Sequence, residues 1–331
     1  MHRILSTSSF RRLPAAFLIA MVSIVCIEAY VWVKAAPSYS NHEVDWLLNQ
    51  LRDRRFNAEY LIIGDSVGRQ ISKQFISNPK FAILATNQAV ETTGHYFLVR
   101  RYLARNPAPK AVIFIGLPFH FRDLDQVYTE NFVLRTFTHT REISDIASTK
   151  YNPVMTAKMI AYKFLPTFKY RLILQENMVG FTNSDIYSGF DNTVNPAKAG
   201  RHSLLRLMKK RRVGHKASTV HFEKLLAYLA MQDIPLYYIP APIKQQKRKK
   251  KQSDSALYQD LFGNYLPAIQ SDHFHYFDSI VEHPGHYFSD RVHFAPEWLP
   301  VAEKYFSDIL DSIIAEIESR SSISEKSERS L

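Results

Sequence analysis

Cysteine is almost missing from this sequence, and glycine is scarce. The single cysteine, Cys26, excludes disulfides within the chain and any metal cluster held by cysteines. Only 10 glycines among 331 residues argue against a repeat or linker-rich architecture. Acidic residues are the minority charge, because 31 Asp and Glu face 42 Lys and Arg, for a net charge of +11. That excess suits an anionic partner such as nucleic acid, lipid head groups or an acidic glycan, without choosing among them.

One long hydrophobic run is present, near the N-terminus. Residues 13–33 read LPAAFLIAMVSIVCIEAYVWV, enough to cross a hydrocarbon core of roughly 30 Å as a helix. Arg3, Arg11 and Arg12 precede this run, and Lys34 alone follows it closely. The positive-inside bias therefore places the N-terminus in the cytoplasm and the remainder of the chain outside.

Two other interpretations of this run exist. A signal peptide cleaved near Val33–Ala35 is the first, although the run exceeds the usual apolar core of about 7–15 residues. A buried helix of a soluble domain is the second, and the basic flank speaks against it. We predict a membrane anchor over 13–33. Glu28 lies near the outer end of the run, where its side chain can reach the interface.

The remainder of the chain alternates apolar strands with amphipathic helices. Expected strands cover 58–64, 81–86, 110–117, 234–243 and 273–280, and expected helices cover 67–77, 91–106, 221–233 and 295–319. Continuous apolar strands that alternate with helices indicate an α/β fold, with a parallel sheet covered on both faces.

This pattern divides the chain into segments. They are a cytoplasmic N-terminus (1–12), the anchor (13–33), a juxtamembrane segment (34–54), an α/β domain (55–319) and a disordered tail (320–331). Residues from about 120 to 220 break the alternation, so we expect a helical insertion there.

Gly64, Asp65 and Ser66 directly follow the first expected strand. Sites in open parallel sheets form outside the carboxyl ends of the strands. A helix starting near Val67 would aim its N-terminal amides at the space beside the Ser66 hydroxyl, which suits a developing oxyanion. Gly64 allows the tight turn. The other interpretation is that Asp65 or Ser66 merely caps this helix, because both residue types are strong N-caps.

A base for such a serine is found near the C-terminus. Asp290 precedes His293 by three residues in HYFSDRVHFAPEW, which leads into the last expected helix. A serine nucleophile needs a base, and the base needs a group that orients it. Asp290 could hold the Nδ1–H of His293 while Nε2 faces the serine. Alternatively, Asp290 binds the backbone locally and His293 is a half-buried loop residue.

Together, the strand-GDS-helix block and the D-x-x-H block resemble the SGNH (GDSL-type) hydrolase superfamily. The motif-bearing parts are 60–71, 81–94, 110–123 and 286–298. The resemblance implies a three-layer sandwich with a mainly parallel, flavodoxin-like sheet, and needs no cofactor or metal.

The resemblance also implies roles for single residues. Ser66 would be the nucleophile, Asp290 and His293 would supply acid and base, and Asp65 with Gly64 would be structural in the motif.

The oxyanion blocks depart from the family pattern. The family adds a glycine after the second strand and an asparagine in a G-x-N after the third. Here Gly94 stands later than expected, Thr92 holds the equivalent position, and Pro118 replaces the asparagine. Proline has no N–H. The candidate oxyanion donors are therefore the Ser66 amide, Thr92, Gly94 and Asn87.

With an anchor and LDQVYTENF (124–132), the chain looks like divergent membrane-anchored members linked to O-acylation of bacterial surface polysaccharides. The resemblance implies an acyltransferase or esterase acting on O-acyl groups of a cell-surface glycan. Expected partners are the polysaccharide or acyl donor and a membrane-bound O-acyltransferase. The expected location is the bacterial inner membrane, single-pass, with the main domain in the periplasm, where nucleic acid is no partner.

The alternative is a non-catalytic SGNH-fold accessory protein that binds glycan or a membrane acyltransferase, which the degraded oxyanion blocks favour. The basic segments 206–216 and 244–251 either contact anionic lipid or polymer or are solvated loops.

Overall fold

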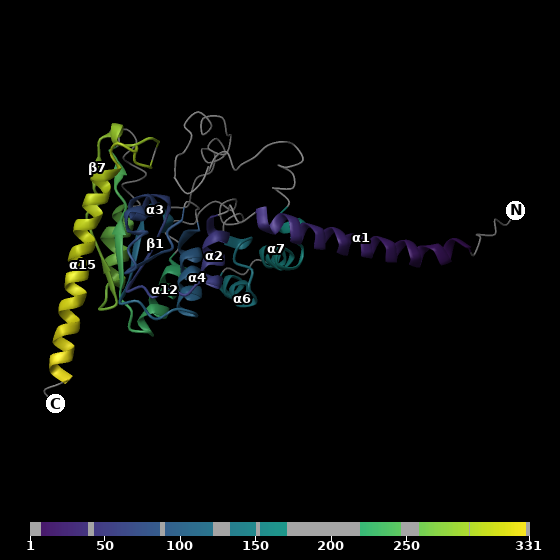
Figure 1. The fold of residues 1–331 in the computed structure, drawn as a ribbon, viewed down its shortest axis with the longest axis horizontal. Helices are drawn as coiled ribbons and strands as arrows, with labels where there is room; N and C mark the ends of the chain where they lie inside the picture. Colours follow the sequence, from purple (N-terminus) through teal and green to yellow (C-terminus); the bar gives the residue numbers. More distant parts are fainter. Residues whose placement is uncertain are drawn as a thin grey trace.

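Five parallel strands form the central sheet of this protein. The computed structural model describes residues 8–38, 43–86, 90–121, 133–149, 153–170, 219–245, 258–290 and 292–328 (Figure 1). The strands are β1 (Tyr60–Gly64), β2 (Phe81–Ile83), β3 (Ala111–Gly116), β4 (Leu236–Pro240) and β6 (Phe274–Tyr276). They lie in the order β2-β1-β3-β4-β6. The predicted α/β class with a mainly parallel sheet is confirmed, and the strand order is the flavodoxin-like one.

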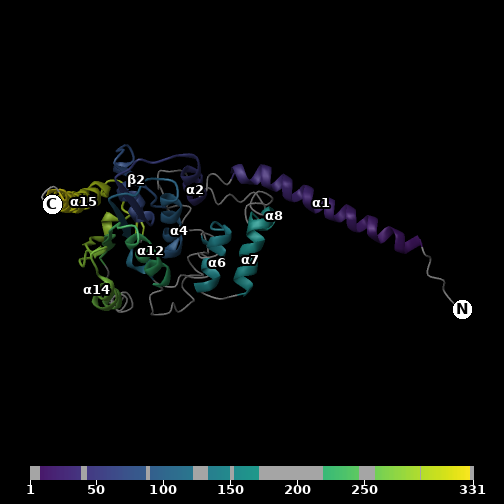
Figure 2. The ribbon, with the colours of Figure 1, turned by 90° about the horizontal axis from the view of Figure 1, so that it is seen from below.

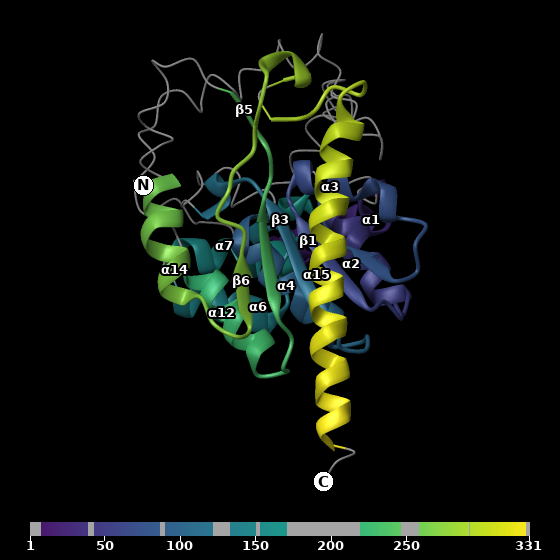
Figure 3. The same ribbon diagram turned by 90° about the vertical axis from the view of Figure 1, so that its left-hand side faces the viewer.

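Helices cover both faces of the sheet. Alternate side chains of β1 divide between the faces, so that Leu61 and Ile63 join one core and Tyr60 and Ile62 join the other. The first core also contains α2 (Glu43–Asp53), α4 (Glu91–Leu103) and α12 (Val220–Ala230), and the second contains α3 (Ser66–Ser72) and α15 (Leu299–Glu328). Figure 3 shows α15 in front of the sheet, with α4 and α12 behind it. Every residue of β1, β3 and β4 is buried, which explains their unbroken apolar sequences.

The described part of the expected insertion is helical. It comprises α6 (Thr140–Thr149), α7 (Pro153–Phe164) and α8 (Pro166–Lys169). These helices lie outside α4, on the side of the domain that carries α1 (Figure 2). Arg101 of α4 forms a bidentate ion pair with Glu142 of α6, with N···O distances of 2.7 and 2.8 Å.

Shorter elements complete the chain. They are η2 (Lys73–Phe75), η3 (Pro118–Phe121), η7 (Leu261–Tyr265), α14 (Leu266–Ile269), η8 (Gly285–Tyr287), and the two-stranded pair of β5 (Ile243–Lys244) with β7 (Glu282–His283).

Several expected boundaries differ from the structure, and two of the differences have a clear physical reason. The strand expected over 234–243 ends at Pro240 and resumes as β5, because prolines at 240 and 242 cannot donate to a ladder. The tail expected to be disordered from 320 continues α15 to Glu328 instead. No proline or glycine interrupts this segment, and Arg320 pairs with Glu316 one turn earlier.

The N-terminal helix α1 (Ser8–Ser38) projects away from the α/β domain (Figure 1). Its segment Ala15–Val33, 19 residues with a mean hydropathy of 2.2, is long and apolar enough to cross a membrane. By length and composition, such a helix serves as a membrane span or as a signal sequence.

Glu28 of α1 has a protein partner, whereas the sequence suggested only that its side chain reaches the interface. One carboxylate oxygen accepts the Thr167 amide at 2.8 Å, and the other accepts the Thr167 hydroxyl. Thr167 lies in the first turn of α8, so Glu28 satisfies an N-terminal amide of that helix.

Burial of His221 makes the fold sensitive to acid. Its Nδ1 lies 3.0 Å from the Thr93 hydroxyl, which ties α12 to α4. Burial, helped by the Lys224 ammonium, lowers the pKa of His221 from 6.5 to about 4. The unfolded chain therefore binds this proton more tightly, and the stabilisation is complete above pH 6.5 and lost as the pH falls toward 4.

We expect protonation of His221 to lower the free energy of unfolding by about 2–3 kcal/mol across that pH interval. His221→Phe keeps the ring contacts with Tyr96 and Phe97 and removes the titration. Urea unfolding at neutral and mildly acidic pH should show a smaller acid loss in the variant than in the wild type. Equal acid losses in the two proteins would contradict the assignment.

Candidate functional site

The turn after β1 is built for a close approach to β3. A Cβ atom on Gly64 would lie 2.2 Å from the Ile115 carbonyl oxygen, and one on Gly68 would lie 2.5 Å from the same atom. Real Cβ atoms do not come this close to backbone, so both positions need glycine. The turn and the first turn of α3 therefore pack directly on β3, which fixes the residues between them.

Asp65 is the N-cap of α3. Its Oδ1 accepts the amides of Val67 and Gly68 at 2.9 and 3.0 Å, and its Oδ2 accepts the Leu117 amide at 2.7 Å. One buried carboxylate thus caps the helix and joins the loop after β1 to the loop after β3. Of the two capping residues that the sequence allowed, the aspartate takes the role, and the Ser66 hydroxyl is left for another partner.

That partner is His293. The Ser66 Oγ lies 2.8 Å from His293 Nε2, and His293 Nδ1 lies 2.7 Å from Asp290 Oδ2. With the neutral ring protonated on Nδ1, Nδ1 donates to the carboxylate and Nε2 accepts the serine O–H. Ser66 is 227 residues from His293 in sequence, yet the three side chains form one hydrogen-bonded chain at the carboxyl end of β1.

Asp290 fixes its own loop as well as the ring. Its Oδ1 accepts the amides of Val292 and His293, both at 2.8 Å, while Oδ2 holds the imidazole. Burial would raise the pKa of Asp290, but the hydrogen bonds from the His293 ring and from the two amides outweigh burial and lower the pKa below 3.8. The local backbone contact and the contact to the ring, which the sequence presented as alternatives, coexist on the two oxygens of one carboxylate.

Gln70 joins the histidine loop to the serine helix, and sequence reasoning missed it. Its side-chain amide donates to the Phe294 carbonyl at 2.8 Å and accepts the Phe294 amide at 3.0 Å. Gln70 is buried on α3, one turn after Ser66, and Phe294 follows His293. A polar residue four positions after the serine, on a helix face that must be covered, was the signal available in the sequence.

We expect Gln70→Leu to impair the Ser66–His293 geometry. The change keeps the volume but leaves the amide and carbonyl of Phe294 unpaired, at about 1–3 kcal/mol for each buried group. If Gln70 positions the base, kcat for hydrolysis of an activated ester should fall roughly 10- to 100-fold with little change in KM.

Gln74→Leu is the matched control. Gln74 follows on η2 and donates to the Glu303 carbonyl of α15 at 3.1 Å, away from the histidine loop. Its kcat should stay close to that of the wild type. A drop in melting temperature with unchanged kcat for Gln70→Leu would reduce Gln70 to a packing residue.

The structure places the candidate oxyanion donors in different environments. Thr92 lies in the first turn of α4, where amides have no acceptor within the helix. Gly94 was wrong as a donor, because its amide is committed to the Val90 carbonyl at 2.7 Å. A Cβ on Gly94 would meet Val90 Cβ at 2.4 Å, so this glycine serves packing. Pro118 begins η3 and brings no amide, and Asn87 lies outside the described residues.

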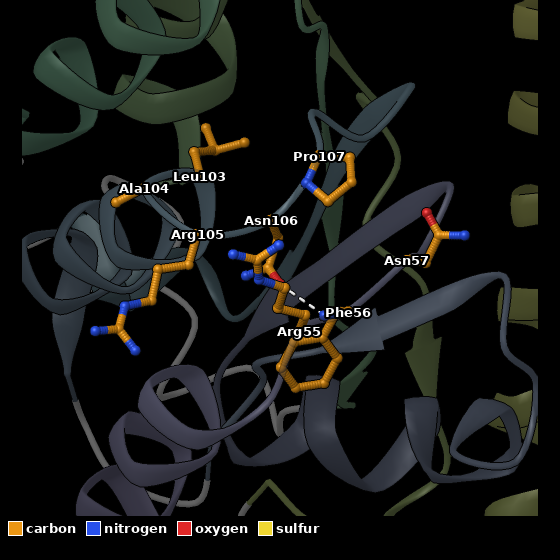
Figure 4. A pocket seen from close by; sticks show the side chains of 8 residues that line it. All are labelled: Arg55, Phe56, Asn57, Leu103, Ala104, Arg105, Asn106 and Pro107. Atoms are coloured by element: carbon orange, nitrogen blue, oxygen red, sulfur yellow. Dashed lines mark hydrogen bonds between the residues drawn. The ribbon is translucent and has the colours of Figure 1, made fainter.

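Two hollows in the described part of the surface lie away from Ser66. One of about 540 Å³ is lined by residues 55–57 and 103–107, which precede β1 and β3 at the opposite end of the sheet (Figure 4). Asn106 closes its floor by accepting the Phe56 amide at 2.6 Å. Another, of about 470 Å³, lies between α4 and α6 beside Arg100 and Asp145. Neither hollow contains a residue of the hydrogen-bonded chain.

Metal ligands and the basic segments remain to be placed. Within the described ranges, no group of three or more His, Cys, Asp or Glu side chains is arranged to hold a metal ion. The basic segment 206–216 lies outside the described residues, as does 244–251 except for its first two residues.

Comparisons with known proteins add little to this geometry. Neither the family models nor the curated proteins compared with this sequence give a match. Among solved structures, the chain is similar to "The structure of a putative platelet activating factor from Streptococcus pneumonia", at 7% identity and a TM-score of 0.34. The match covers 90% of this chain and 99% of that one. A TM-score this low supports no conclusion about fold or function, so the functional assignment rests on the site itself.

Proposed function

We propose that this protein is a serine-dependent acyl-transfer enzyme of the hydrolase type. The observation that supports the proposal is the continuous Asp290–His293–Ser66 hydrogen-bonded chain, with both links below 3 Å, at the strand end where α/β proteins form sites. Ser66 is the nucleophile, His293 the general base, and Asp290 the group that orients the ring.

The chemistry follows from these positions. As Oγ bonds to the acyl carbon of an ester, His293 Nε2 takes the hydroxyl proton, and Asp290 stabilises the imidazolium. The amides of Ser66 and Thr92, at the N-termini of α3 and α4, are the candidate donors to the oxyanion. Collapse breaks the ester C–O bond, and His293 returns the proton to the departing alcohol. Water or a sugar hydroxyl then attacks the acyl-enzyme by the reverse sequence of proton transfers.

Trapping the acyl-enzyme tests this proposal. The full-length protein is incubated briefly with p-nitrophenyl acetate, quenched in acid and digested. An acetyl mass increase on the Ser66 peptide is expected in the wild type, and Ser66→Ala should lack it. Acetylation that is equal in the two proteins would refute Ser66 as the nucleophile.

The second candidate is a non-catalytic accessory protein with the same fold. Pro118 favours it, because the loop after β3 lacks the amide that a further oxyanion donor requires. A folded wild-type protein that forms no acyl-enzyme, yet retains an oligosaccharide or a membrane acyltransferase in a binding assay, would establish this function.

We further propose a cell-surface glycan as the acyl acceptor or substrate and a periplasmic location for the domain. The sequence motifs and the α1 segment Ala15–Val33 support both proposals. A membrane-bound O-acyltransferase is the proposed partner, since a membrane anchor would hold the two proteins in one plane.

Fusion of a reporter after Leu331 tests the topology. The reporter should be exported, because the arginines before the apolar segment of α1 favour a cytoplasmic N-terminus, and the protein should resist a carbonate wash of the membranes. A soluble product that has lost the α1 segment would establish the signal-peptide interpretation instead.

A further inference from the structure

Helix α7 carries an apolar stripe that the described part of its own domain leaves exposed. Val154, Ile160 and Phe164 are 65%, 47% and 66% exposed, and Leu165 directly after the helix is 41% exposed. At 100° per residue, the three helical positions and Ala157 fall on one face. The opposite face contains the buried Met159 and Tyr162. Helix α7 therefore has apolar side chains on its exposed face as well as on its buried face.

The helix that carries the stripe is linked to α1 through α8. Helix α8 follows α7 directly, and its first-turn Thr167 is held by Glu28 of α1 through the amide and the hydroxyl. Val31, one turn further along α1, is buried although most of the helix is exposed. Tyr162 of α7 stacks on Phe168 of α8, with ring centroids 5.0 Å apart. These contacts link the position of α7 to the point where α1 leaves its apolar segment.

Helix α7 is oriented so that it could lie along the surface of a membrane that α1 crosses. In Figure 2, α7 lies crosswise to α1, with α6 between it and the rest of the domain. Since Met159 and Tyr162 face the protein, the stripe faces away from it, on the side toward which the N-terminal part of α1 extends.

Lysines flank the stripe. Lys158 and Lys163 fall on either side of it by helical spacing, and the Lys163 ammonium lies 5.2 Å from the centroid of the Phe164 ring. Lysines beside an apolar face, with an aromatic ring at its end, are the pattern of helices that lie in a lipid interface. The Lys163 ammonium also donates to the Thr140 hydroxyl at 2.6 Å, which holds it beside the stripe. Cations beside an apolar face favour an anionic lipid surface.

We propose that α7 lies flat in the outer interface of the membrane that α1 crosses, with Val154, Ile160, Phe164 and Leu165 inserted among the lipids. This rests on α1 being a membrane span and is independent of the acyl-transfer chemistry. The Glu28–Thr167 contact then sets the depth of the domain, because it joins α8 to α1 at a fixed residue of the span.

Depth-dependent quenching tests the proposal in the full-length protein. Cys26→Ser removes the native thiol, and Ile160→Cys or, as a second site, Val154→Cys adds one on the stripe. An environment-sensitive fluorophore is attached, and the protein is reconstituted in vesicles of phosphatidylethanolamine and phosphatidylglycerol. Lipids with a spin label high on the acyl chain should quench most of the stripe emission, and aqueous iodide should quench little.

Two comparisons make the result decisive. Ile76→Cys, at an isoleucine outside the helical insertion that is about as exposed as Val154, should show the opposite quenching. A fluorophore on native Cys26 reports on α1 itself and should be quenched by labels deep in the bilayer. Because every site carries the same fluorophore, differences among them reflect position alone.

Each other outcome overturns the inference in a distinguishable way. Iodide quenching at 160 and 154 with a lipid-quenched Cys26 means that α1 spans while α7 stands in water. Shielding from both quenchers that disappears on dilution with lipid means that a second copy covers the stripe. Failure of deep quenching at Cys26 removes the premise and the proposal together.

Discussion

Replacing Ser66 with alanine should abolish covalent labelling by a fluorophosphonate while leaving the melting temperature almost unchanged. Within the described residues the hydroxyl forms one hydrogen bond, to His293, at the carboxyl end of β1, and the capping of α3 is carried by Asp65. The loss in stability should therefore be about 1 kcal/mol, the worth of one hydrogen bond. The readout is in-gel fluorescence of the labelled protein beside a thermal melt of the same preparation.

Substitution of the other two residues should give a graded result. His293→Ala should reduce the labelling rate almost as far as Ser66→Ala, because a serine hydroxyl is a poor nucleophile without its base. Asp290→Asn keeps the backbone contacts through its remaining oxygen but removes the charge that selects the tautomer, so a fall of up to about 10⁴-fold is expected. Labelling that persists in Ser66→Ala would refute the nucleophile. An unlabelled, well-folded wild type would favour the accessory function.

The second large effect concerns the turn itself. Gly64→Ala should destabilise the fold by several kcal/mol and remove the site, because its new methyl group would overlap the Ile115 carbonyl at 2.2 Å. That oxygen belongs to the backbone of β3, which cannot move without breaking the pairing of β3 with β1 and β4. Overpacking of a flexible core costs about 1–3 kcal/mol, and a strained backbone or a displaced strand costs more than that.

Gly263→Ala is the control for this substitution. A Cβ on Gly263 would meet its nearest neighbour, Gln259 Cγ, at 3.9 Å, an ordinary contact on an exposed helical turn. Alanine there should be neutral or stabilising by up to about 1 kcal/mol. Denaturant titrations of both variants provide the comparison. Similar stabilities for Gly64→Ala and Gly263→Ala would show that the turn yields more easily than its contacts indicate.

The central sheet could be predicted because its strands are buried on both sides. Residues such as Leu61 and Ile62 are both apolar although they point to opposite faces, and only a strand covered twice requires this. Ends of elements were harder, since the tail after Glu318 contains polar residues that neither require nor forbid a helix. The pairing of Glu28 with Thr167 joins residues 139 positions apart and has no local signature.

The candidate site divides in the same way. Ser66, Asp290 and His293 could be named because short motifs hold them, but the role of Asp65 as cap could not be separated from that of Ser66 by residue type alone. Gly94 was misassigned although it lies in the helix expected over 91–106, because whether its amide is bonded depends on the exact start of that helix, after its N-cap Val90. Gln70 carries no motif, and its partner is the backbone of Phe294, which a sequence never displays.

The double contact between Gln70 and Phe294 also bears on how the site responds to motion. Ser66 begins α3, and the residue after His293 is clamped to the same helix by two hydrogen bonds. Ser66 and His293, the proposed nucleophile and base, therefore move together, although they come from opposite ends of the chain. A tilt of α3 against the sheet would carry both along and preserve their 2.8 Å separation, while it would change their distance to α4. Breathing of this domain should accordingly modulate oxyanion binding before it disturbs proton transfer.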